Sequence, residues 1–155
     1  FASSCANKLR GQNAGARTVT VFLSSNRFRE DLQQYANSAT YTFITPTSDT
    51  LEITQAALAV IKEIYRPGIL YKKSGVIVGD ICDMSMLQMN LFDPVSNRKE
   101  RADLMKAIDE LNHRYGLKTV KLMAESESKQ PWQVKCEHRS QNYLTDINEI
   151  LTVRI

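Results

Sequence analysis

The chain has 155 residues, of which 43% are hydrophobic and 24% are charged. This composition suits one ordinary globular domain or two small ones, and it excludes wholesale disorder, which requires few apolar residues and a high net charge. No run of 18 apolar residues occurs, so we expect no membrane-spanning helix. The net charge of +3 permits an acidic partner but does not identify one.

The cysteines and histidines do not form a recognisable site. Three cysteines, Cys5, Cys82 and Cys136, lie far apart and give neither a disulfide framework nor a closely spaced metal-binding pair. His113 and His138 have no spacing that pairs them with a cysteine as zinc ligands. We therefore expect no metal or cofactor in this chain, and a reduced cytoplasmic environment. Because the chain begins at Phe1, not Met, we expect a piece of a longer protein.

The first 83 residues predict the order α-β-β-α-β. Helical spacing predicts a helix over residues 1–12, and β-branched alternation predicts strands over 17–24, over 39–45, where Pro46 stops the strand, and over 71–82. The alternation over 17–24 predicts two faces, one with Val19, Val21 and Leu23 and the other with Thr18, Thr20, Phe22 and Ser24. A second helix follows Asp49, which has capping-box spacing to Glu52, and ends before Pro67-Gly68. A further strand ahead of Phe1 would complete a split βαβ, ferredoxin-like α+β domain, with two helices on one face of a four-stranded antiparallel sheet.

The second half of the chain has a weaker pattern. Residues 84–97 read as a linker with an apolar centre. A helix from Arg98 to Gly116 carries an apolar stripe expected to be core, consisting of Ala102, Leu104, Met105, Ile108, Leu111 and Tyr115. Short strands are predicted over 118–123 and 131–135, with a last one at the end of the tail, over 150–155, so residues 98–155 would form a second, small α/β region.

The linker contains a short segment with the character of a docking peptide. Gln88, Met89, Leu91 and Phe92 resemble the bacterial sliding-clamp-binding peptide Q-L-x-L-F. Leu91 and Phe92 would anchor in an apolar pocket, and the Gln88 amide can both donate and accept hydrogen bonds. The alternative is that Met89, Leu91 and Phe92 pack into the protein's own core.

Further segments resemble the UmuC family of SOS error-prone, Y-family translesion DNA polymerases, in family order over nearly the whole chain. They are Ala6-x-Lys8-Leu9-Arg10, Asn37-Ser38-Ala39, Thr45-Pro46-Thr47-x-Asp49, Tyr71 to Val76, Gly79-Asp80, the QMNLFD segment, Leu104-Met105, Asp109-x-Leu111-Asn112, Pro131-Trp132-Gln133-x-Lys135 and Ser140-x-x-Tyr143-x-Thr145.

The resemblance implies a division of labour along the chain. Residues 1–83 would be most of a little-finger domain that holds template–primer duplex by contacts to the DNA backbone. Residues 84–97 would be a linker that contains the clamp motif, and residues 98–155 would be the family's accessory domain. The DNA-contacting residues expected are Arg17, Thr18, Thr20, Thr40, Thr42, Lys72, Lys73 and Ser74. The family's first little-finger strand would precede Phe1.

The same resemblance implies partners and a location. Besides DNA and the sliding clamp, the partners would include a processed UmuD dimer and RecA, and the location would be the bacterial cytoplasm at the nucleoid. The polymerase palm, with its Mg²⁺-binding carboxylates, lies upstream in this family, so we expect this chain not to catalyse nucleotidyl transfer although its parent would.

Two other classes of function compete with this interpretation. A stand-alone regulatory or scaffold protein could use a ferredoxin-like domain to bind a ligand or a protein, with QMNLF as ordinary core. An RNA-recognition module is a weaker candidate, because Phe22 with Tyr41 or Phe43 is a poor match to paired aromatics on central strands.

Overall fold

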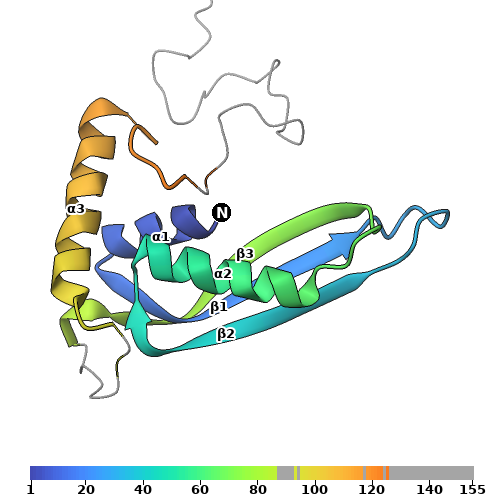
Figure 1. Ribbon diagram of the computed structural model, residues 1–155, viewed down its shortest axis with the longest axis horizontal. Helices are drawn as coiled ribbons and strands as arrows, with labels where there is room; N and C mark the ends of the chain where they lie inside the picture. Colours follow the sequence, from blue (N-terminus) through green and yellow to red (C-terminus); the bar gives the residue numbers. More distant parts are fainter. Residues whose placement is uncertain (87–92, 94, 117, 124, 126–155) are drawn as a thin grey trace, which may run out of the picture. The chain divides into compact units, whose positions relative to one another are not determined.

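The computed structural model describes residues 1–86, 93, 95–116, 118–123 and 125 (Figure 1). Its contacts divide the chain into two compact units, residues 1–121 and 122–155, and the elements below all belong to the first. In chain order they are α1 (Ala2–Gly11), β1 (Ala14–Ser25), β2 (Ala36–Thr47), α2 (Thr50–Ile64), β3 (Tyr71–Asp83), the 3₁₀ turn η1 (Met84–Met86) and α3 (Arg98–Tyr115). The predicted α+β class and the order α-β-β-α-β are confirmed.

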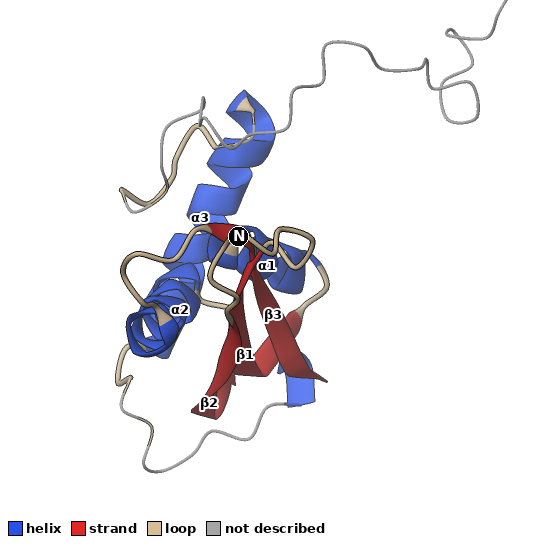
Figure 2. Ribbon diagram, turned by 90° about the vertical axis from the view of Figure 1, so that its right-hand side faces the viewer, coloured by secondary structure: helices blue, strands red, loops and turns tan. Residues whose placement is uncertain are grey.

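The sheet is antiparallel and has the strand order β2-β1-β3. Helices α1 and α2 pack on the same face of the sheet, and the core lies between the helices and β1 (Figures 1 and 2). The largest fully buried side chains there include Val19, Val21 and Ile53. Three strands are present among the described residues; the four-stranded arrangement predicted above includes a strand ahead of Phe1.

Two predicted details need correction. Strand β2 continues through Pro46 to Thr47 instead of stopping at the proline. Proline has no N–H to donate, but β2 lies at the edge of the sheet, where a missing donor is tolerated. Residues 118–123 form turns and irregular backbone, not the predicted strand. The strands predicted over 131–135 and 150–155 lie outside the described residues.

Helix α3 has the predicted bounds, but its apolar stripe is not core. Only Met105, with 2% of its surface exposed, is buried, whereas Leu104 is 50% and Tyr115 is 63% exposed. Helical spacing shows which side chains share a face, but it does not show which face packs. In the described part of the chain, no helix is long and apolar enough to cross a membrane.

Candidate nucleic-acid-binding surface

The face of the sheet opposite α1 and α2 carries small polar side chains. Along β1 the buried residues Val19, Val21 and Leu23 alternate with less buried ones, and the alternation turns a second set of side chains to the open face. That set is Thr18, Thr20, Phe22 and Ser24. The division of β1 into these two faces agrees with the prediction from the sequence.

The strand register brings the predicted DNA-contacting threonines together. Thr20 is paired with Thr40 on β2, and their hydroxyl oxygens lie 2.7 Å apart. Thr18 is paired with Thr42 on the same strand, and Ser24 is paired with Lys73 on β3. Five of the eight predicted residues therefore lie on one surface. They are Thr18, Thr20, Thr40, Thr42 and Lys73.

The other three predicted residues are exposed but do not follow this alternation. Arg17 lies where the β1–β2 register shifts, between Ala16 and Thr18. Lys72 lies at the register shift between β1 and β3, where Ser24 is paired with Lys73 and Ser25 with Tyr71. Ser74 is paired with Leu23, whose side chain faces the helices. Such irregularities reverse the side-chain faces and cannot be located from alternation alone. A role for these three residues in binding stays a prediction.

Two glycines of β3 make room for side chains of β1 on the open face. A Cβ atom at position 75 would lie 2.4 Å from ring atoms of Phe22, and one at position 79 would lie 2.7 Å from the Thr18 hydroxyl oxygen. The side chains of Phe22 and Thr18 therefore lie across β3 at these points, which keeps the face low in relief. Phe22 and the half-exposed Ile77, paired with Thr20, add apolar surface that was not among the predicted site residues. For Phe22, its alternation with the buried Val21 and Leu23 was the signal in the sequence that could have identified it.

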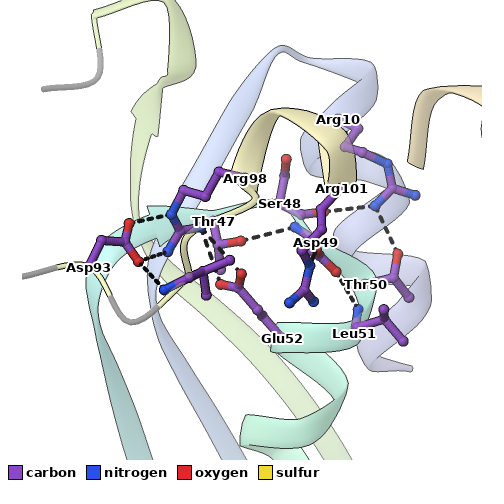
Figure 3. A network of polar contacts seen from close by, with 11 residues as sticks. Arg10, Thr47, Ser48, Asp49, Thr50, Leu51, Glu52, Asp93, Arg98 and Arg101 are labelled. Atoms are coloured by element: carbon purple, nitrogen blue, oxygen red, sulfur yellow. Dashed lines mark hydrogen bonds and ion pairs between the residues drawn. The ribbon is translucent and has the colours of Figure 1, made fainter. Parts of the chain in front are cut away.

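The end of the sheet where α2 begins carries a network of ion pairs (Figure 3). The Arg98 guanidinium contacts both carboxylate oxygens of Asp93 and lies 3.3 Å from a Glu52 oxygen. The hydrogen bonds from Arg98 lower the pKa of Asp93 to about 2. Arg98, the first residue of α3, is thereby fixed to the first turn of α2.

The same network contains the N-cap of α2. The Asp49 carboxylate accepts a hydrogen bond from the Leu51 N–H at 2.7 Å and from Arg101 Nε at 2.6 Å. Asp49 caps α2, but the predicted capping box is not formed, because the Asp49 N–H donates to the Thr47 hydroxyl while Glu52 pairs with Arg98. Arg98 and Arg101 are thus both ion-paired with carboxylates. This region is therefore a structural junction and a poor site for an anionic ligand.

The described residues contain no group of three or more His, Cys, Asp or Glu side chains arranged to hold a metal ion. Cys5 and Cys82 are free thiols. The clamp-like residues Gln88, Met89, Leu91 and Phe92 lie outside the described residues, so their binding role stays a prediction.

Two family models match the chain. The impB/mucB/samB family C-terminal domain matches residues 1–91, which include the whole sheet and both helices packed on it. A domain of unknown function (DUF4113) matches residues 102–153.

Curated relatives match over similar or greater lengths. The chain is 35% identical to Protein UmuC of Salmonella typhimurium (strain LT2) over 154 residues, covering 99% of this chain and 36% of that protein. It is 34% identical to Protein ImpB of Salmonella typhimurium over 155 residues, covering 100% of this chain and 36% of that protein, and 34% identical to Protein MucB of Escherichia coli over 114 residues, covering 74% and 27%. The chain thus spans about a third of the length of the first two relatives. With the fold, the open sheet face and these matches in agreement, the chain belongs to the impB/mucB/samB family through that family's C-terminal domain.

Proposed function

We propose that this chain is the non-catalytic C-terminal part of a translesion DNA polymerase, and that its sheet holds template–primer duplex during SOS damage bypass. The observation that carries the proposal is the open face, where four threonines and Lys73 come together on three adjacent strands in a member of the impB/mucB/samB family. Nucleotidyl transfer, with its Mg²⁺ ions, belongs in this proposal to the upstream part of the parent protein.

The chemistry of the open face suits binding to the phosphate backbone without reading sequence. Hydroxyl groups and ammonium groups donate hydrogen bonds to phosphate oxygens, and such contacts position a protein on DNA independently of base identity. The low relief at Gly75 and Gly79 lets a broad, curved partner approach the strands closely. A polymerase that moves along its template needs this kind of grip, because its affinity must not depend on the bases that pass.

A second element of the proposal is a tether to the sliding clamp through residues 88–92. The segment is too short to bury the roughly 1,200 Å² of a stable interface. Linked to the DNA contacts it gains an effective concentration of order millimolar, so two modest interactions acting together would keep the enzyme at a stalled fork. Processed UmuD and RecA are further partners in this proposal, which places the protein at the bacterial nucleoid.

The duplex-holding role is tested by measuring the affinity of the chain for short duplex DNA by fluorescence anisotropy over a series of salt concentrations. The variant Lys73→Ala should bind more weakly and reduce the steepness of the log–log salt dependence by about 0.9, the value for one phosphate contact. Lys62→Ala is the matched control, because Lys62 is an exposed residue of α2, on the covered side of the sheet. A flat salt response, or equal losses in both variants, would refute the proposal.

The tether is tested separately, by measuring binding of the chain to its sliding clamp. The double variant Leu91→Ala/Phe92→Ala should abolish binding, while Leu104→Ala, which removes an exposed leucine of α3, should leave it unchanged. Binding that survives the double variant would remove the tether from the proposal and leave the duplex-holding role standing.

A further inference from the structure

The loop that joins β1 to β2, residues 26–35, is internally braced. The side-chain amide of Gln34 donates hydrogen bonds toward three backbone carbonyl oxygens of the loop, those of Asn26 at 3.1 Å, Arg29 at 2.8 Å and Leu32 at 3.2 Å. Asn26 in turn accepts a hydrogen bond from the Phe28 N–H through its own side chain at 3.1 Å. One glutamine thus holds the turn in a single shape, and Figure 1 shows this loop extending beyond the end of the sheet.

The base of the loop is fixed to the sheet and to α2. Tyr35 donates its N–H to the Ser25 hydroxyl at 2.9 Å and its phenol O–H to the Ile64 carbonyl at 2.5 Å. Its ring meets the ring of Tyr71 edge-on at 6.0 Å, and the Arg66 guanidinium lies 5.3 Å from its centre. The loop is therefore a rigid extension of the folded domain.

This rigid loop presents a phenylalanine to solvent. Phe28 is 96% exposed and lies between Arg27 and Arg29. A single exposed apolar side chain is ordinary, but a fully exposed aromatic ring in a braced loop gains nothing for the fold and loses little entropy when a ligand covers it.

The charges around the loop favour an anionic ligand. Arg29 is paired with Asp31, but four other basic side chains at this end form no ion pair within the described residues. These are Arg27, Arg66, Lys72 and Lys73. The loop has two acidic residues, and of these Asp31 is paired with Arg29 while Glu30 forms no ion pair within the described residues. The surface therefore attracts a polyanion.

We infer that Phe28 is a stacking site for an unpaired base of single-stranded DNA that continues from the duplex on the open face; this rests on the proposed function. The path is continuous, because Ser24 lies one residue before the end of β1, where the loop begins, and is paired there with Lys73 of the neighbouring strand β3. Bases inside a duplex are stacked on both faces and leave no face for a protruding ring, whereas an unpaired base of a single strand offers a free one. Base–aromatic stacking flanked by cations is the usual way in which proteins bind single strands without sequence preference.

The experiment compares two DNA ligands, a blunt duplex and the same duplex with a single-stranded extension, using the 155-residue chain at low salt. The extension should strengthen binding by the parent chain, and Phe28→Ala and Phe28→Leu should remove that gain, a loss of roughly five- to a hundredfold. Phe28→Trp should retain the gain. All variants should bind the blunt duplex as the parent does, which also shows that they are folded.

The outcomes distinguish failure of the stacking site from failure of the proposed function. An extension that adds nothing to the parent's affinity, or a Phe28→Leu variant that keeps the whole gain, would overturn the stacking site while blunt-duplex binding still supports the proposed function. Failure of the parent chain to bind the blunt duplex would overturn both the stacking site and the proposed duplex-holding role. A gain that disappears with Phe28→Leu and persists with Phe28→Trp supports an aromatic contact with a base.

Discussion

Arg10 and Asp109 lie 99 residues apart in the sequence and form a two-point ion pair in the folded chain, with Nε–Oδ2 and Nη2–Oδ1 distances of 2.6 and 2.8 Å. The remaining nitrogen of Arg10 donates to the Ser48 carbonyl oxygen and to the Thr50 hydroxyl. One guanidinium therefore joins α1, the start of α2 and α3. Since Met105 is the one side chain of α3 that is buried, this polar junction supplies much of what holds α3 in place.

Asp109→Asn should loosen α3 and destabilise the fold by about 1 kcal/mol, because the pair is charge-assisted but partly exposed. The free energy of unfolding in urea would show this loss, and the loss should shrink at high salt. Glu110→Gln is the matched control, since the exposed Glu110 forms no ion pair among the described residues. If both substitutions cost the same, the Arg10–Asp109 pair has no special role.

The Asp93–Arg98 pair should make stability depend on acid. The pKa of Asp93 is lowered to about 2 in the folded chain, below its unfolded value of about 3.9. A depressed carboxyl pKa contributes stability that is complete above about pH 4 and is lost as the pH falls to about 2. The stability difference between the parent and Asp93→Asn should therefore be constant near neutrality and vanish toward pH 2, as followed by urea unfolding. A difference that stays constant down to pH 2 would contradict the low pKa.

Asp49 has two separable roles, as the N-cap of α2 and as the partner of Arg101. Asp49→Asn keeps an oxygen that can accept the Leu51 N–H but removes the charge opposite Arg101, whereas Asp49→Ala removes both. We expect the alanine variant to be less stable than the asparagine variant by about 1 kcal/mol, the typical value of a cap. Thermal unfolding of the two variants side by side measures this difference, and equal midpoints would assign the whole effect to the ion pair.

Gly75→Ala should weaken DNA binding more than it changes stability. The added methyl group would displace the Phe22 ring and raise the relief of the open face, while alanine costs the strand little backbone entropy. The expected result is a several-fold loss of duplex affinity with a shift in unfolding free energy of about 1 kcal/mol or less. Gly11→Ala is a control, because a Cβ at that position meets nothing within 4 Å. Unchanged duplex affinity in Gly75→Ala would show that low relief at this point is not needed.

The sequence predicted the parts of this fold that depend on local periodicity. The alternation of valines and threonines along β1 identified both faces of the central strand, and the Asp49 cap identified the start of α2. These features are local because neighbouring residues share one strand or one helical turn. The open face was therefore predictable in outline before its neighbours were known.

The parts that were missed depend on contacts between distant segments. Helical spacing grouped Leu104 with Met105, but the packing of α3 against the rest of its unit buries one and exposes the other. The Arg10–Asp109 pair could not be inferred, because nothing near either residue points to the other. The bracing of the loop 26–35 could not be inferred either, since three hydrogen bonds from one Gln34 side chain leave no pattern in the sequence.

The central position of β1 has a consequence for amide hydrogen exchange. From Thr18 to Ser24 its residues are paired with β2 on one side and with β3 on the other. Successive N–H groups of β1 therefore point alternately toward β2 and toward β3, and each faces a neighbouring strand. Along β2 and β3, every second N–H of the described sheet points away from β1. The β1 amides should therefore retain their protons longest in deuterated water, at rates set by opening of the whole unit, while the flanking strands exchange at alternate residues through small local fluctuations.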